Sequence, residues 1–265
     1  MQQQSNGYII GFVLVLCVLI GGLLAGTSIV LGPAQQKSLE LDTKSQILSA
    51  VRAVVDVPEK PDEVLATYEK RITSTVVNYN GEEVTTLPDG TPIVAENVNV
   101  AAEYGKPLKE RLYPVFRLVD ENDANRVQAY ILPVYGNGLW DKIWGYVALD
   151  QSMETIVGTS FDHKAETPGL GQRIATPEIQ DRFVGKKIFD DEGKLVSVTM
   201  MKGEHGGGEN SIAYYADDPH RVDGMSGATL TGNGLNAMLK TYFTGYRNFI
   251  KKVRANATST ADAGQ

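Results

Sequence analysis

Cysteine is nearly absent from this sequence of 265 residues, and the single example is Cys17. Because Cys17 lies inside an uncharged apolar run, the remainder of the chain can form neither an internal disulfide nor a thiolate metal site. Basic residues are also in deficit, with 25 Lys and Arg against 32 Asp and Glu and a formal net charge of −7. Nucleic acid binding depends on clustered Lys and Arg that neutralise phosphates, so this composition argues against nucleic acid as a partner.

Charge of either sign is missing from the beginning of the chain, where the first charged residue is Lys37. The run 8–31 is almost entirely apolar, and a helix of that length spans roughly 36 Å, enough to cross a hydrocarbon core of about 30 Å. A cleaved signal peptide would need basic residues ahead of a shorter apolar core, and none precedes Tyr8. The sequence therefore predicts a retained transmembrane helix over residues 8–31, preceded by an N-terminal tail of residues 1–7.

Helical patterns continue after the predicted span. Residues 38–55 place apolar side chains largely at helical spacing, two prolines end this segment, and a short helix is expected over 62–71. We therefore expect a helical connector over residues 32–71. Lys37 and Lys44 follow the span and nothing basic precedes it, which weakly favours a cytoplasmic position for the following domain, although long domains cross membranes largely regardless of such charges.

From residue 72 the pattern changes to short apolar runs separated by Asn-Gly and Asp-Gly turn signals, which is typical of β-structure. The runs that predict neighbouring strands lie at 112–119, 127–135, 143–149 and 154–160. A further hairpin is expected around the turn at residues 190–193.

The final helix has the clearest pattern. Apolar residues from Leu235 to Val253 follow the spacing of an amphipathic helix, with Thr231 and Asn233 as candidate N-caps. Residues 255–265 are small and polar and are expected to form a flexible tail. The predicted fold class is therefore α+β: one transmembrane helix, then a single domain over residues 72–254 with a mainly antiparallel sheet and flanking helices.

The stretch DGMSGATLT, residues 223–231, lies just before this helix and combines glycines with three hydroxyl side chains. Gly224 and Gly227 allow positive φ or close backbone approach. The hydroxyls of Ser226 and Thr229 lie near a helix N-terminus, where free N–H groups and the helix dipole favour an anion. The stretch lacks the lysine of a Walker motif and the preceding strand of a dinucleotide fingerprint. A simple helix-capping turn would explain the same residues.

Two other glycine-containing loops add to this pattern. YGNGLW, residues 135–140, ends a predicted strand and exposes a Leu-Trp pair, and ETPGLG, residues 166–171, sets Pro168 and Leu170 between small residues. A planar ligand needs apolar surfaces on which to stack and a few backbone donors around its rim. Each loop alone could be an ordinary turn, but the three together predict a shared pocket for a flat ligand.

The three motifs, in this order behind one N-terminal span, resemble the FMN-binding domain found in the C subunit of the Na⁺-translocating NADH:quinone reductase. The related G subunit of the Rnf electron-transport complex shares this module and is the alternative. The resemblance covers essentially the whole chain. It implies that FMN is joined through its phosphate to the hydroxyl of Thr229, with Thr231 as the competing acceptor. The remaining residues implied in the FMN site are Asp223, Gly224, Ser226, Gly227, Ala228, Leu139, Trp140, Glu166, Thr167, Pro168, Gly169, Leu170 and Gly171.

The resemblance also implies a cellular role. The protein would be a phosphoprotein in which the flavin carries electrons from NADH towards a quinone such as ubiquinone, coupled to Na⁺ export. Its partners would be the other subunits of a membrane redox complex, together with a flavin transferase that uses FAD and Mg²⁺. The resemblance places the protein in the bacterial inner membrane with its domain on the periplasmic side. No catalytic side chain and no metal ligand are implied.

Three histidines do not fit this scheme. Relatives commonly carry a histidine two residues before the glutamate of the ETPGLG motif, whereas His163 lies three before Glu166. The segment 203–209, with His205 between carboxylates, is a weak metal pattern and predicts a mobile loop. An anchored serine hydrolase with Ser226 as nucleophile would need one of the three histidines, including His220, as its base. A non-catalytic envelope-binding domain is the third interpretation.

Overall fold

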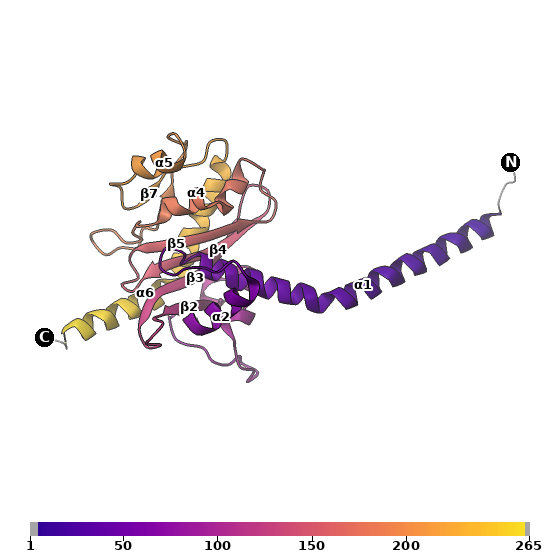
Figure 1. Ribbon diagram of the computed structural model, residues 1–265, viewed down its shortest axis with the longest axis horizontal. Helices are drawn as coiled ribbons and strands as arrows, with labels where there is room; N and C mark the ends of the chain where they lie inside the picture. The colour runs from indigo at the N-terminus through magenta and orange to yellow at the C-terminus, as the bar shows by residue number, and fades with distance from the viewer. Residues whose placement is uncertain (1–4, 263–265) are drawn as a thin grey trace. The chain divides into compact units, whose positions relative to one another are not determined.

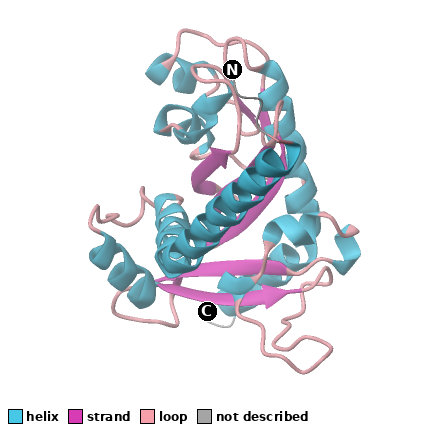
Figure 2. Cartoon of the chain, turned by 90° about the vertical axis from the view of Figure 1, so that its right-hand side faces the viewer, coloured by secondary structure: helices cyan, strands magenta, loops and turns pink. Residues whose placement is uncertain are grey.

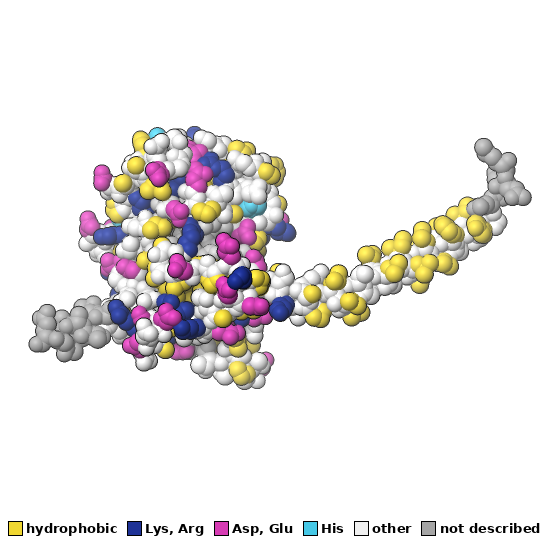
Figure 3. All heavy atoms as spheres, in the orientation of Figure 1, with side chains coloured by type: hydrophobic (Ala, Val, Ile, Leu, Met, Phe, Trp, Pro, Cys, Tyr) yellow, Lys and Arg dark blue, Asp and Glu magenta, His cyan; other side chains and the backbone are white. Residues whose placement is uncertain are grey.

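The computed structural model describes residues 5–262, with side chains as far as Asn256. The chain divides into two compact units, Met1–Thr43 and Lys44–Gln265, and each is considered by itself. Helix α1 spans Asn6–Ser49, so it begins and ends beyond the predicted span 8–31. Among the described residues it is the one helix long and apolar enough to cross a membrane, with a mean hydropathy of 2.8 in its most apolar window. Hydrophobic side chains cover much of its visible surface (Figure 3).

A five-stranded antiparallel sheet forms the centre of the second unit (Figure 1). The strands follow one another in space in the order of the sequence, because each apolar run is joined to the next by a connection that reverses the chain. Their bounds are β1 Ile72–Val77, β2 Tyr113–Val119, β3 Val127–Asn137, β4 Lys142–Asp150 and β5 Ile156–His163. The predicted fold class and the four predicted strands are therefore confirmed.

One face of the sheet packs against the C-terminal helix α6, Thr229–Asp262. The residues that meet there alternate along the strands and recur at helical spacing in α6, including Leu132, Val134, Val147, Leu235, Leu239, Phe243 and Tyr246. Burying such side chains contributes about 1.5–3 kcal/mol each, so this interface makes a large contribution to the stability of the domain. It also holds the first turn of α6 beside the ends of β3 and β5.

The opposite face of the sheet is covered by the segment that follows Lys44. Ile47, Leu48 and Val51 are completely buried there. The Arg52 guanidinium reaches across to the carbonyl oxygen of Thr159, at 2.9 Å, and also pairs with Asp181. The sheet is thus enclosed between helical segments and loops, and Figure 2 shows the strands in magenta among these elements.

The remaining elements are short and lie in the connections. The helices are α2 Pro61–Arg71, α3 Val100–Tyr104, α4 Pro177–Gln180 and α5 Gly208–Tyr214, with 3-10 turns at Ala95–Asn97, Leu108–Glu110, Gly171–Ala175 and Asp181–Phe183. Two short strands, β6 Thr199–Met200 and β7 Arg221–Val222, pair in parallel as a separate sheet.

Several boundaries differ from the predictions. The helix expected to reach residue 55 ends at Ser49 and continues only as turns. The hairpin expected around 190–193 keeps its turn, with an Asp190 N–H to Lys194 oxygen bond of 3.0 Å, but only one β-bridge forms beside it. Helix α6 continues to Asp262, so it includes residues 255–262 of the segment 255–265 that was expected to be a flexible tail, and residues 263–265 lie outside the described chain.

Candidate functional site

Glu166 joins the three loops that the sequence singled out. Its carboxylate is 4% exposed and accepts hydrogen bonds from the Trp140 backbone N–H, at 3.0 Å, and from the Thr231 hydroxyl. These donors come from the turn between β3 and β4 and from the first turn of α6, respectively. The predicted meeting of the three loops is therefore observed, with a buried carboxylate at its centre.

Gly171 explains how the loops approach so closely. A Cβ atom at this position would lie 2.5 Å from both Glu166 Oε2 and Thr231 Oγ1, closer than any real contact allows. Gly227 has a similar role on the outer side, because it has φ +73° and its missing Cβ would lie 2.8 Å from Leu170 Cδ2. Close packing therefore requires glycine at position 171, and close packing together with a positive φ requires it at position 227.

The residues before α6 form a tight turn. The Ala228 N–H donates to the Met225 carbonyl at 3.1 Å, and Gly227 takes the positive φ that such a turn requires at its third residue. Ser226 and Gly227 are exposed, whereas Ala228 is buried. The turn therefore presents its small residues to solvent immediately ahead of Thr229.

The helix begins three residues earlier than a cap at Thr231 would require, and five earlier than a cap at Asn233. Thr229 is its first residue, and the Gly232 N–H donates to the Ala228 carbonyl at 3.0 Å, so Ala228 is the N-cap residue. The prediction that Thr231 or Asn233 caps the helix is wrong. Alanine carries no side-chain acceptor, so the first N–H groups of α6 keep their capacity to bind an anion from outside the chain.

The two threonines of the motif have different surroundings. Thr229 is half-buried, and within residues 5–256 no hydrogen bond reaches its hydroxyl. Thr231 is 1% exposed and donates its hydroxyl hydrogen to Glu166. A bulky phosphate could reach the first hydroxyl but not the second without the loops moving apart.

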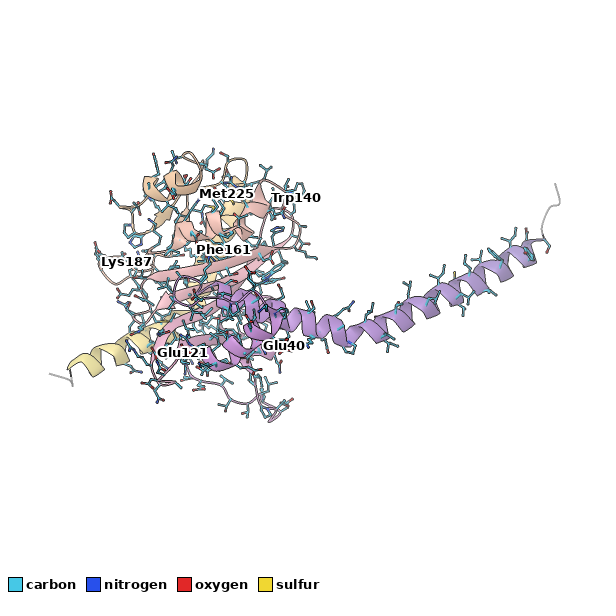
Figure 4. The ribbon with its side chains drawn as sticks, viewed as in Figure 1. Glu40, Glu121, Trp140, Phe161, Lys187 and Met225 are labelled. Carbon is cyan, nitrogen blue, oxygen red and sulfur yellow. The ribbon has the colours of Figure 1, made fainter. Side chains whose placement is uncertain are left out.

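Exposed apolar side chains lie in these loops and in the first turn of α6. Leu139, Trp140 and Leu170 are 43%, 68% and 40% exposed, and Leu230, which the sequence did not single out, is 59% exposed. The Trp140 indole N–H donates to the Thr167 hydroxyl at 3.0 Å, so the ring is held while its surface stays open. In Figure 4 the labelled Trp140 lies in the same upper part of the domain as Met225 of the turn. Exposed Pro168 and Gly169 complete the second loop.

These residues fit a flavin nucleotide. An isoalloxazine ring is flat and largely apolar, and exposed Trp and Leu surfaces can stack on it. A phosphate fits the uncapped helix start, where the dipole and the N–H groups favour negative charge.

A set of charged residues that sequence reasoning missed lies beneath the turn. The Glu204 carboxylate accepts hydrogen bonds from Arg173, from Arg182 and, at 3.1 Å, from the Ser226 N–H. The hydrogen bonds from Arg173, followed by those from Arg182 and Ser226, lower the pKa of Glu204 to about 2, against the opposing effect of burial. These residues are scattered along the sequence, and their spacing carries no signal that could have identified them.

Asp223 of the motif is completely buried and binds His205. The His205 N–H donates to one carboxylate oxygen at 2.7 Å, and its ring Nδ1 lies 2.8 Å from the other. Burial alone would raise the pKa of Asp223, but the His205 backbone N–H, the Ser211 side chain and the His205 ring together hold the pKa below its ordinary value. The segment expected to be a mobile loop is therefore tied to the motif, and among the described residues no group of three or more His, Cys, Asp or Glu could hold a metal ion.

The other histidines do not form a hydrolase site. His163 accepts a hydrogen bond from the Glu166 N–H at 3.3 Å, which gives it a role in shaping the ETPGLG loop. His220 contacts the carbonyl oxygen of Lys187 at 2.8 Å. In the part of the chain whose side chains are described, no hydrogen bond joins the Ser226 hydroxyl to a histidine, so the arrangement of a serine nucleophile and its base is missing there.

Comparison with known proteins agrees with this geometry. Residues 138–244, which include the second half of the first loop and the whole of the other two, match the family model described as FMN-binding domain. The chain is 31% identical to the C subunit of the Na(+)-translocating NADH-quinone reductase of Yersinia pestis, over 96% of each chain. It is 32% identical to the corresponding C subunit from Neisseria meningitidis, over 92% of each chain.

Solved structures agree as well. The C subunit of the Na(+)-translocating NADH-quinone reductase from Parabacteroides distasonis superimposes with a TM-score of 0.65 at 32% identity, covering 82% of this chain and 94% of that one. Shewanella oneidensis NqrC superimposes with a TM-score of 0.64 at 25% identity, covering 82% and 99%.

Proposed function

The chain belongs to the family of Na⁺-translocating NADH-quinone reductase C subunits, and we propose that it carries FMN joined covalently to Thr229 through a phosphoester. The observation that carries this assignment is the environment of Thr229. Its side chain is half-buried, and it is the first residue of a helix whose N-cap, Ala228, supplies no acceptor. A phosphodiester there keeps one negative charge beside the N–H groups that favour it.

Attachment is a phosphoryl transfer from FAD. The Thr229 oxygen attacks the phosphorus on the riboflavin side of the pyrophosphate, and the new oxygen–phosphorus bond replaces the bond to the second phosphate. AMP leaves, and the hydroxyl proton passes to a base of the transferase or to water. A Mg²⁺-dependent flavin transferase is the partner for this step, because within residues 5–256 no hydrogen bond joins the Thr229 hydroxyl to a general base. Mg²⁺ stabilises charge on the departing phosphate.

The other loops orient and hold the ring. Trp140, Leu139 and Leu170 offer apolar surface, and Glu166 fixes the turn that carries Trp140 relative to the start of α6. FMN, when bound, supplies one- and two-electron transfer, whereas the protein supplies attachment, orientation and electrostatics. No side chain need act as an acid or base on a diffusing substrate.

We propose that the subunit relays electrons within a complex that passes them from NADH towards quinone and exports Na⁺. Helix α1 is consistent with a membrane anchor that keeps the flavin close to partner subunits. We assign the domain to the periplasmic side of the bacterial inner membrane. Alkaline phosphatase needs disulfides, which form in the periplasm, so its fusion to the C-terminus should give an active enzyme. An inactive phosphatase fusion, together with fluorescence from a fluorescent protein fused at the same point, would place the domain in the cytoplasm.

The attachment site is tested by intact-mass and peptide analysis of the full chain, co-expressed with the transferase. The wild type should gain one FMN phosphoester, located on the peptide that contains Thr229, and a fluorescent band on a denaturing gel. Thr229→Ala should lose both, and Thr229→Ser, which keeps a hydroxyl, should retain part of the modification. A fluorescent band that persists in Thr229→Ala would refute the assignment, and labelling of Ser226 by a fluorophosphonate probe would favour the hydrolase instead.

A further inference from the structure

Arg182 is a buried arginine beneath the turn that precedes Thr229. It is 1% exposed, although arginine is among the residues least often buried. Its guanidinium donates to the backbone carbonyl of Gly224, to Glu178 Oε1 at 3.0 Å and to Glu204 Oε1 at 2.6 Å. Two carboxylates and a carbonyl thus compensate the burial of one positive charge, and one of these partners belongs to the DGMSGATLT motif.

A second segment also contacts the same turn. Residues 199–205, here called the strap, begin with β6, which pairs in parallel with β7 directly before the motif. The Met201 N–H donates to the Val222 carbonyl at 2.9 Å, and a Cβ atom on Gly224 would overlap the Met201 carbonyl. The strap ends in the pair Glu204 and His205, which are bound to the motif.

Arg182 and the strap together hold successive parts of the motif. Asp223 is held by His205, Gly224 by Arg182, and the N–H of Ser226 by Glu204. Beyond Ser226 these contacts stop, and Gly227 and Thr229 are at least partly open to solvent. The motif therefore has a rigid base and an accessible end.

We propose that Arg182, acting through Glu204 and the Gly224 carbonyl, is a positioning residue for flavin attachment. The inference rests on the proposed attachment to Thr229. A phosphoryl transfer requires the attacking oxygen in line with the bond that breaks, so the acceptor must be held within a narrow range of positions. Arg182 provides this for Thr229 without touching the ligand, because it fixes the backbone of the turn three to five residues earlier.

The test measures the rate of FMN attachment to purified, flavin-free full-length protein in detergent, with purified transferase, FAD and Mg²⁺. The variants are Arg182→Met, which removes the charge at similar volume, Arg182→Lys, which keeps the charge but not the planar fork, and Glu204→Gln. The matched control is Arg254→Met. Arg254 also bridges a carboxylate, Glu154, and lies 25 residues from Thr229 along α6, about 37 Å away.

We expect Arg182→Met to lower the rate constant at saturating FAD and saturating transferase at least tenfold. Arg182→Lys should fall between it and the wild type, and Arg254→Met should match the wild type. Because the substitution affects the alignment of the Thr229 hydroxyl and not the binding of FAD, the KM for FAD should change less than threefold. Circular dichroism and thermal unfolding identify variants that are folded, which separates loss of positioning from loss of the fold.

Attachment to folded Arg182→Met at the wild-type rate would overturn the inference. If Arg182→Met does not fold, Glu204→Gln decides: a fivefold or larger loss of rate supports the inference, and a smaller loss overturns it. The test of Arg182 can be distinguished from the test of the attachment site. Wild-type protein modified elsewhere than Thr229 would refute the proposed function, whereas correct modification of wild type and Arg182→Met at equal rates would refute only the role of Arg182.

Discussion

Replacing Thr231 by valine separates stability from attachment, because the two threonines of the motif occupy different environments. Valine has nearly the same shape and is β-branched, so the substitution removes the hydroxyl with little change in packing or helix propensity. Thr231 is 1% exposed, and its hydroxyl donates to a carboxylate that is itself buried. The matched change, Thr229→Val, removes a hydroxyl from a half-buried side chain, and no hydrogen bond to that hydroxyl is found within residues 5–256.

The magnitude follows from these contacts. A hydrogen bond to a charged group is worth about 1.5–3 kcal/mol, so Thr231→Val should lower the free energy of unfolding by about 2 kcal/mol. For a domain of this size each kcal/mol shifts the melting temperature by about 2–4 °C, which predicts a decrease of about 4–8 °C. Thr229→Val should stay within about 0.5 kcal/mol of the wild type.

Differential scanning calorimetry of the flavin-free full chain in detergent measures the first quantity, and fluorescence on a denaturing gel measures covalent flavin. Thr231→Val should be less stable yet fluorescent after modification, and Thr229→Val should be as stable as wild type but dark. The reasoning fails if Thr231→Val melts at the wild-type temperature, or if it is the variant that loses the covalent flavin while Thr229→Val keeps it.

Two further predictions concern the packing and the charges around the site. Gly171→Ala should lower the free energy of unfolding, measured by urea titration, by about 1–3 kcal/mol, because the new methyl group would lie 2.5 Å from Glu166 and Thr231 oxygens. The control is Gly105→Ala, where the nearest atom is 3.4 Å away, and it should change the free energy of unfolding far less. Stability should also fall as the pH is lowered from about 4.5 to about 2, because the depressed pKa of Glu204 contributes up to about 3 kcal/mol above that window and nothing below it. Glu204→Gln should flatten this part of a melting-temperature profile, and an unchanged profile would contradict the role of the carboxylate.

Local patterns in the sequence were sufficient for the architecture. The uncharged run near the N-terminus, the apolar runs between turn signals and the helical spacing after Leu235 each depend on contacts within a few residues or on one repeated period. The predicted strands and the final helix are confirmed for this reason, and the membership of the family was accessible from three short motifs. Boundaries were less well predicted, because the start of α6 depends on a turn whose cap is an alanine.

Contacts between distant residues arise only in the folded chain. Glu166 and Thr231 are 65 positions apart, and Arg182 and the Gly224 carbonyl are 42 apart. Neither pair belongs to a motif with a fixed spacing or a recurring residue pattern. The atoms of each pair meet because the tertiary packing of the domain brings their loops together. The sequence alone therefore establishes an α+β chain with a flavin-type motif and an N-terminal segment long and apolar enough to cross a membrane. The tertiary structure distinguishes the accessible Thr229 from the buried Thr231, because burial and long-range hydrogen bonding are properties of the assembled loops.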